Sequence, residues 1–316
     1  MVLDVAAGDM MQVAGGRPDR SPEGELRCSV VIPAYNASRW IERTVASALA
    51  QTLPDIEVIV VDDGSADDTA DRLSAFGDRL TLIRQANAGV AAARNAGAAR
   101  ATADHIAFLD SDDVWSPDKI ERQVALFDEN PDVVLVHCGV REIDENDLPL
   151  TGEVLRGCTG DVHRDLILQR PAISGGGSGA MFARWAFDSV GGFDTRFSTS
   201  ADWHLWLRIT RLGPVAMVPE PLLDYRIHGS NMHLDVMAEA RDMFLGLREA
   251  IAEDPIAAEL GNLALARCHR TMAGGFWNEK KRIRFVRHAA SAILREPSTI
   301  AWLAGRLARR FPHRRI

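Results

Sequence analysis

Three carboxylates lie within four residues at Asp110, Asp112 and Asp113, directly after a short apolar run that ends at Leu109. Like charges packed this closely repel one another, and a divalent cation with oxygen ligands is the usual way to offset that cost. Mg²⁺ and Mn²⁺ take few protein carboxylates and complete their coordination with substrate phosphates. The run therefore predicts a site for a metal and a diphosphate. The alternative is a solvated acidic turn ahead of a helix that begins near Pro117.

Two further polar clusters follow apolar runs in the same way. Pro33-Ala34-Tyr35-Asn36 ends the first run, and Asp62-Asp63-Gly64-Ser65 ends the second. Each cluster taken alone also suits an ordinary turn, because Asp, Asn, Gly and Ser are common turn residues. Ligands of open α/β sheets bind at the carboxyl ends of the strands. Three polar clusters at such ends therefore predict one shared site.

The elements that must position these clusters alternate between strand and helix. Short apolar runs predict strands at residues 29–33, 56–61, 80–83, 105–109 and 133–136. Stretches of helical period between them predict helices at 39–51, capped by Ser38, and at 67–75, 89–101 and 117–130. This alternation indicates an α/β fold with a mixed, largely parallel central sheet. The glycine-rich run Ser174–Gly179 predicts a loop or a close approach of the backbone, and the chain beyond residue 233 is expected to be helical.

Length and composition are those of an ordinary folded protein. The 316 residues are 47% apolar and 25% charged, with a net charge of −8, which excludes disordered, collagenous and coiled-coil classes. Residues 280–316 carry eleven basic residues and one acid, so subtracting this +10 from the total leaves −18 on the rest. No apolar run reaches the length of a membrane-spanning helix. The four widely separated cysteines fit a reduced, cytoplasmic protein.

The ordered motifs resemble those of the family-2 inverting glycosyltransferases. The resemblance covers about residues 28–230 and rests on the segments Val30–Asn36, Val61–Thr69, Asn87–Gly97 and Phe108–Asp113. It implies a GT-A-type nucleotide-binding fold at residues 28–232. A mobile leader at 1–27 and a helical, basic C-terminal extension at 233–316 are expected to flank it. A P-loop or Rossmann enzyme is disfavoured, because neither glycine signature is present.

The resemblance also implies a role for each residue of the nucleotide site. Asp63 would accept a hydrogen bond from the base, which favours a UDP or dTDP donor. Arg94 would either neutralise the diphosphate or brace the acidic turn, and both interpretations stay open. Asp112 would reach the ribose or the metal, and Asp113 the metal, here Mn²⁺ or Mg²⁺. The full set expected to bind the nucleotide is Pro33, Ala34, Tyr35, Asn36, Asp63, Arg94, Asp110, Ser111 and Asp112.

The second half is expected to serve the acceptor. Ser200–Arg208 resembles the family's segment that bears the catalytic base, although Ala201 stands where that segment more often has Glu. Asp202 would then be the base that removes the proton of the acceptor hydroxyl. The alternative for Asp202 is a helix cap. His228, within Tyr225–Asn231, is expected to be a third metal ligand or a diphosphate ligand, or else an ordinary loop histidine.

Together these features predict a metal-assisted, inverting glycosyltransferase. It would transfer a sugar from a nucleoside-diphosphate sugar to a glycan or lipid-linked acceptor in cell-envelope glycan synthesis. The basic C-terminus would make peripheral contact with the cytoplasmic face of a membrane, or would pack on the acidic body instead. No nucleic-acid partner is expected. A non-catalytic nucleotide-sugar-binding or scaffold protein on the same fold is the alternative.

Overall fold

A computed structural model of the chain describes residues 26–232 and 235–302. The predicted mobile leader falls almost wholly on residues 1–25, outside the described residues. At the start of the described chain the Arg27 amide donates to the Asp55 carbonyl at 2.7 Å. The Arg27 guanidinium also pairs with Asp128 at 2.8 Å. The chain is therefore fixed to the domain from Arg27 onward.

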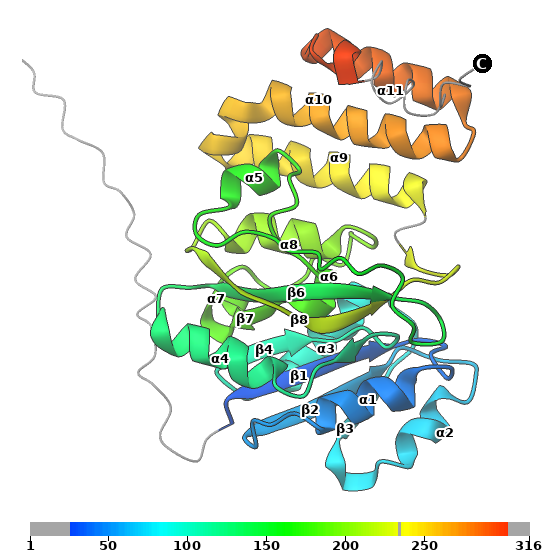
Figure 1. The fold of residues 1–316 in the computed structure, drawn as a ribbon, viewed down its shortest axis with the longest axis vertical. Helices are drawn as coiled ribbons and strands as arrows, with labels where there is room; N and C mark the ends of the chain where they lie inside the picture. The colour runs from blue at the N-terminus through cyan, green and yellow to red at the C-terminus, as the bar shows by residue number, and fades with distance from the viewer. Residues whose placement is uncertain (1–25, 233–234, 303–316) are drawn as a thin grey trace, which may run out of the picture.

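One mixed sheet forms the centre of the described structure, with the order β3-β2-β1-β4-β7-β6-β8-β5 (Figure 1). β1, β2, β3 and β4 run parallel to one another, β6 is parallel to β8, and β7 is antiparallel to both β4 and β6. β5 pairs antiparallel with β8 at one edge. The strands are β1 Cys28–Ala34, β2 Ile56–Asp62, β3 Thr81–Arg84, β4 His105–Phe108, β5 Val114–Trp115, β6 Leu135–Ile143, β7 Met181–Ala183 and β8 Val215–Arg226. The predicted mixed, largely parallel α/β sheet is confirmed.

Helices cover the sheet, and the last three form a separate stack. Figure 1 shows α9, α10 and α11 lying in that order beyond α8, on the side away from α1 and α2. The helices are α1 Ile41–Leu49, α2 Thr69–Ser74, η1 Gly77–Arg79, α3 Val90–Arg100, α4 Lys119–Glu129, α5 His163–Ile167, α6 Gly176–Gly179, α7 Arg184–Ser189, α8 Ala201–Ile209, α9 Val236–Glu253, α10 Pro255–Asn278 and α11 Arg282–Arg295. The described part of the predicted helical extension is helical.

Small residues let α3 lie directly on the parallel strands. A Cβ atom at Gly97 would come within 2.3 Å of the Val31 side chain on β1 and 3.2 Å of Val61 on β2. Such distances are far inside van der Waals contact, so only glycine fits where the helix crosses the strands. The alanine-rich sequence of α3 serves the same close packing. The depth of α3 in turn fixes the position of Arg94, one turn earlier on the helix.

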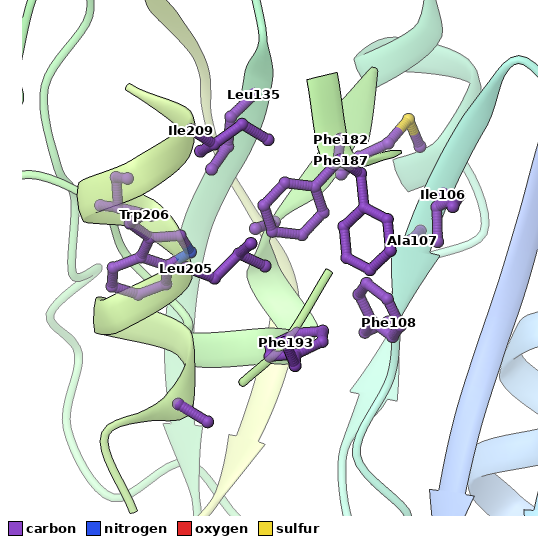
Figure 2. Close-up of a cluster of buried hydrophobic side chains, with 14 of the residues drawn as sticks. Ile106, Ala107, Phe108, Leu135, Phe182, Phe187, Phe193, Leu205, Trp206 and Ile209 are labelled. Atoms are coloured by element: carbon purple, nitrogen blue, oxygen red, sulfur yellow. The ribbon is translucent and has the colours of Figure 1, made fainter. Parts of the chain in front are cut away.

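An aromatic cluster joins α8 to the sheet (Figure 2). Phe108 of β4 meets Phe193 edge to face at 5.0 Å, and Phe182 of β7 packs beside Phe108 at 5.9 Å. Leu205 of α8 reaches the same cluster and is fully buried. Because edge-to-face aromatic packing is directional, this cluster holds the orientation of α8 and of the side chains in its first turn.

Three local expectations differ from the structure. Ser38 does not cap α1, because the helix begins at Ile41 and its N-cap position is Trp40, two residues beyond Ser38. The run at residues 133–136 begins as a strand only at Leu135 and continues to Ile143, where it pairs with β8. The predicted loop at Ser174–Gly179 contains one helical turn, α6.

A buried histidine ties the helical extension to the sheet domain. His163 of α5 bonds through Nδ1 to the Thr210 hydroxyl at 2.9 Å and through Nε2 to the Asp254 carboxylate. Asp254 also caps α10 by accepting from the Ile256 amide. No helix within residues 26–232 and 235–302 is long and apolar enough to cross a membrane. The basic residues beyond Trp302 lie outside the described chain.

Candidate active site

The three polar clusters gather at one edge of the sheet, as the sequence predicts. β1 lies between β2 and β4 and runs parallel to both, so the carboxyl ends of the three strands are adjacent. The Asp63 amide donates to the Ala34 carbonyl at 2.8 Å, and the Leu109 amide donates to Val31. The turns that follow the strands are therefore side by side.

Asp113 is the buried anchor of the acidic turn. Its side chain is 1% exposed, and its two oxygens accept from the Ser178 hydroxyl at 2.6 Å and from the Arg226 amide at 2.9 Å. Burial, together with the neighbouring carboxylates Asp112 and Asp110, raises the pKa of Asp113 well above its usual range. This geometry is that of a brace inside the protein, and a role for Asp113 as a metal ligand stays a prediction.

Asp112, the partly exposed carboxylate of the turn, pairs with His228, whose side chain is 6% exposed. His228 Nε2 lies 2.7 Å from Asp112 Oδ2, and a quarter of the Asp112 side chain is exposed. The imidazole packs on the Trp40 ring at 4.5 Å and bonds through Nδ1 to the Ser230 hydroxyl at 2.8 Å. One carboxylate oxygen and one imidazole nitrogen thus meet, although they are 116 residues apart in sequence.

Arg94 joins the acidic turn to the second half of the chain. Its guanidinium donates to Asp110 at 2.6 Å and to Asp202 at 2.7 Å, and its side chain is only 4% exposed. Burial lowers the pKa of Arg94, but the charges of Asp110 and Asp202 outweigh burial and raise it above its usual range. Burial raises the pKa of Asp110, against the lowering effect of Arg94. The structure shows Arg94 bracing the acidic turn, and its role in neutralising the diphosphate stays a prediction.

Asp202 lies in the first turn of α8 with 22% of its side chain exposed. The N-cap of α8 is Ser200, so the alternative prediction that Asp202 caps the helix is wrong. A Cβ atom at Gly177 would stand 2.6 Å from the Arg94 guanidinium and 3.4 Å from Asp202. The glycine run thus lets the backbone approach the ion pair closely, which is the second of the two predictions made for this run.

The turns after β1 and β2, where the sequence predicts the nucleotide, are joined by hydrogen bonds. Asp63 is 3% exposed and accepts from Gln85 at 2.7 Å and from the amides of Ala88 and Gly89, immediately before α3. Asn36, at φ 49°, accepts from the Ala66 amide at 2.9 Å. Tyr35 is 53% exposed at the rim, whereas Pro33 and Ala34 are buried in β1. Asp63 therefore fixes the start of α3, a role that the sequence did not suggest.

The sequence reasoning missed two braces of the acidic turn. Ser178 accepts from the Asp110 amide at 3.0 Å while it donates to Asp113, and a hydroxyl between glycines was the available signal. Arg226 is fully buried; it donates to the Asp112 carbonyl at 2.7 Å and to the Asp147 carboxylate at 2.6 Å. Ser111 contributes its carbonyl, which accepts from the Thr44 hydroxyl at 3.1 Å. No local pattern marks an arginine for complete burial.

One other group of potential metal ligands occurs among the described residues, at Asp194, His204 and Glu249. Arg196 already pairs with Asp194 at 2.5 Å and with Glu249 at 2.7 Å. His204 stacks on the Phe197 ring at 3.9 Å, and burial lowers its pKa to about 4. The guanidinium supplies the positive charge that these two carboxylates need, so the group is a surface ion-pair network.

Known proteins resemble this chain in sequence. The sequence profile described as Glycosyl transferase family 2 matches residues 29–191. An uncharacterized glycosyltransferase of Nostoc sp. is 36% identical over 228 residues, which span 66% of this chain and 67% of the relative.

Solved structures share the fold at lower identity. The first 349 residues of S. aureus TarS, in complex with UDP-GlcNAc, give a TM-score of 0.66 at 16% identity and cover 85% of this chain and 81% of that one. The mannosyltransferase PcManGT of Pyrobaculum calidifontis, in complex with GDP-Man and Mn²⁺, gives 0.59 at 22% identity and covers 93% and 84%. The fold is therefore of the GT-A type.

Proposed function

The chain belongs to glycosyl transferase family 2 and is a glycosyltransferase, and from this premise we propose that it transfers a sugar with inversion from a nucleoside-diphosphate sugar to an acceptor hydroxyl. The main support is the pairing of one buried guanidinium, Arg94, with both Asp110 and Asp202. It places the candidate base beside the turn that would receive the diphosphate. Solved structures of the same fold hold UDP-GlcNAc and GDP-Man.

The residues of the acidic turn suit a divalent cation. Asp110 and Asp202 share one guanidinium, Arg94. The Asp112 carboxylate accepts no hydrogen bond from an arginine among the described residues, because the Arg226 guanidinium donates to the Asp112 carbonyl and to Asp147. Asp112 and His228 are the groups that would hold Mn²⁺ or Mg²⁺, which need few protein ligands when phosphates complete the shell. Such an ion supplies positive charge to the departing diphosphate. Asp113 and Ser178 keep the turn in place from inside.

The chain's own groups then carry the proton and the charge. Asp202 accepts the proton of the acceptor hydroxyl while the acceptor oxygen bonds to the anomeric carbon. On the opposite face, the bond from that carbon to the phosphate oxygen breaks, and the nucleoside diphosphate leaves with the electron pair. Arg94 lies within reach of both ends of this displacement, so its charge favours the leaving diphosphate and its hydrogen bond holds the Asp202 carboxylate in position.

The base would be recognised by Asp63. One oxygen of its carboxylate already accepts two bonds, from Gln85 and Ala88, whereas Oδ2 accepts only from the Gly89 amide among the described residues. Oδ2 retains acceptor capacity for the ring N–H of uracil or thymine, which supports a UDP or dTDP donor. Tyr35 at the rim offers its ring to the base.

The acceptor is proposed to be a glycan or lipid-linked sugar of the cell envelope, the class that the sequence resemblance implies. Gly176 and Gly177 lie directly against Asp202, so their backbone would line the approach of the acceptor hydroxyl. The alternative of a non-catalytic binding protein loses support, because the chain is a glycosyltransferase by family and keeps a partly exposed Asp202 at the site.

A screen of donors tests the proposal. The full chain would be incubated with UDP-, dTDP- and GDP-sugars and Mn²⁺ or Mg²⁺, and released nucleoside diphosphate would be measured. We expect release from a UDP- or dTDP-sugar, stimulated by the cation and lost in the Asp112→Ala, His228→Ala double variant. Equal release of nucleoside diphosphate with and without the cation would contradict the metal proposal. Release from GDP-sugars alone would contradict the role of Asp63.

A further inference from the structure

The last described helix, α11, has an apolar stripe on its outer face. Ile283, Val286 and Leu294 are 80%, 60% and 84% exposed, and Ala290 is exposed between them. At 3.6 residues per turn these four positions fall within an arc of about 80°. Exposed large apolar side chains scattered singly are ordinary, but three in one line on one helix form a patch.

The opposite face of α11 already has its partner within the chain. Ala289 and Ala292 are buried, and Phe285 packs on Trp277 of α10 with ring centroids 4.8 Å apart. His288 lies against His269 of α10 at 5.0 Å. The stripe is therefore a second apolar face, which the fold does not use for packing within the described residues.

Arginines flank the stripe, and none of them has a carboxylate partner among the described residues. Arg282, Arg284, Arg287 and Arg295 are all exposed, and α11 contains no acidic residue. Two exposed arginines of the sheet domain do have such partners: Arg39 pairs with Glu145 at 2.7 Å, and Arg43 pairs with Asp147 at 2.6 Å. Arg282 and Arg295 bond to carbonyls of their own neighbourhood, Trp277 and Ser291, which leaves their charge without a counterion. Four such cations beside an apolar stripe favour an anionic surface outside the chain.

We propose that this face of α11 lies on an anionic lipid bilayer, parallel to its surface. The stripe of Ile283, Val286, Ala290 and Leu294 would enter the boundary between headgroups and acyl chains, and the arginines would meet lipid phosphates. A second copy of the chain fits less well, because a twofold interface brings the same patch against itself and would set arginines against arginines. The proposal is independent of the roles given to Asp112, His228 and Asp202.

The position of α11 gives this contact a consequence for the acceptor. α11 is the outermost layer of the molecule, with α10 and α9 between it and α8, which carries Asp202 (Figure 1). A bilayer under α11 would therefore lie several helix layers from the reaction. The acceptor hydroxyl would have to stand out from the membrane on an extended glycan.

Vesicle flotation of the full chain tests the proposal. We expect the protein to float with vesicles that contain phosphatidylglycerol, to float poorly with phosphatidylcholine alone, and to be released by high salt. Leu294→Asp and Ile283→Asp should each reduce the bound fraction strongly. Each Arg→Gln change at Arg282, Arg284, Arg287 or Arg295 should weaken binding about fivefold.

The controls separate this helix from general surface effects. Leu212→Asp and Arg100→Gln make the same chemical changes at exposed positions of the sheet domain and should leave flotation unchanged. All variants keep residues 303–316, so binding through that tail would persist in them. Unchanged flotation of the α11 variants would overturn the proposal. A fall in oligomeric mass in these variants, with no flotation of the unaltered chain, would show a protein interface instead.

Discussion

Arg94 is the residue on which the site depends, because it pairs with carboxylates from both halves of the domain. Asp110 follows β4, and Asp202 begins α8, 108 residues beyond Arg94. A buried guanidinium with two carboxylate partners holds both at fixed positions through charge-assisted bonds. The same contact holds the carboxylate of Asp202, the proposed base, beside the acidic turn.

Replacement of Asp202 by Asn should abolish transfer and leave donor binding intact. The amide keeps the shape of the side chain but cannot accept the proton, so we expect turnover to fall by at least 100-fold. Turnover and the affinity for the nucleotide sugar would be measured on the same preparation.

Asp188→Asn is the matched control. Asp188 pairs with Arg184 on the surface of α7, 55% exposed, and its loss should change neither quantity. Turnover that survives Asp202→Asn would show that another group removes the proton.

Replacement of Ser178 by Ala should loosen the acidic turn. The change leaves Asp113 Oδ2 without its donor in a buried position and removes the acceptor of the Asp110 amide. We expect a loss of about 1–3 kcal/mol in the free energy of unfolding, measured by urea denaturation, together with weaker donor binding. Ser189→Ala, which removes an exposed hydroxyl that bonds only to Trp185 within α7, should cost little. Equal stabilities would mean that Ser178 does not brace the turn.

At the scale of elements, the short segment around α6 connects the fold to the chemistry. Its glycines lie against Arg94 and Asp202, and its start is fastened to β6 by His137. The His137 ring bonds to Ser174 at 3.0 Å and to the Cys158 carbonyl at 2.8 Å. A neutral, buried imidazole is thus part of the support beneath the glycine run.

Acid should destabilise the fold through His137. Burial lowers the pKa of His137 to about 4, below the ordinary 6.5, so between pH 6.5 and 4 the unfolded chain binds the proton more readily. Stability contributed by the neutral ring is therefore complete above pH 6.5 and is lost as the pH falls towards 4, by about 3 kcal/mol. In His137→Gln, which retains a donor for Cys158, the free energy of unfolding should depend less on pH across this window. Denaturation curves at several pH values check this, and parallel profiles for the two proteins would refute it.

At the scale of the whole molecule, the extension docks on the sheet domain through a buried polar contact. His163 lies between Thr210, just beyond α8, and Asp254, which begins α10. This contact connects three segments that are far apart in sequence. The stack of α9, α10 and α11 therefore holds a fixed position relative to α8, and with it the stripe on α11.

Asp254→Asn should weaken that docking. The variant loses the charged acceptor of His163 in a buried site, and we expect about 2 kcal/mol less stability. Amide exchange should become faster in α9 and α10 while β1 and β2 remain protected. Glu259→Gln, which removes an exposed pair with Arg164, should have an effect below about 0.5 kcal/mol. Uniform acceleration across the sheet would show that His163 and Asp254 stabilise the whole domain and not the docking alone.

The sequence by itself determined five of the eight strands, namely β1, β2, β3, β4 and β6, and the three polar clusters that follow β1, β2 and β4, whereas β5, β7 and β8 were not predicted. These features depend on neighbouring residues: apolar runs of strand length and turn residues at fixed spacing are local signals. The resemblance to a glycosyltransferase family rested on the same local segments, and the profile match agrees with it.

Only the tertiary structure decided what surrounds each carboxylate of the acidic turn. It buried Asp113 behind Ser178 and Arg226, left Asp112 beside His228, and joined Asp110 to Asp202 through Arg94. The sequence of the acidic turn does not indicate which of its side chains points inward. Ser178, Arg226 and His228 lie 65 to 116 positions later in the chain than their partners in the turn, and Arg94 lies 16 positions earlier than Asp110. Such contacts depend on how α8 and β8 pack on the sheet, and no local pattern encodes that packing.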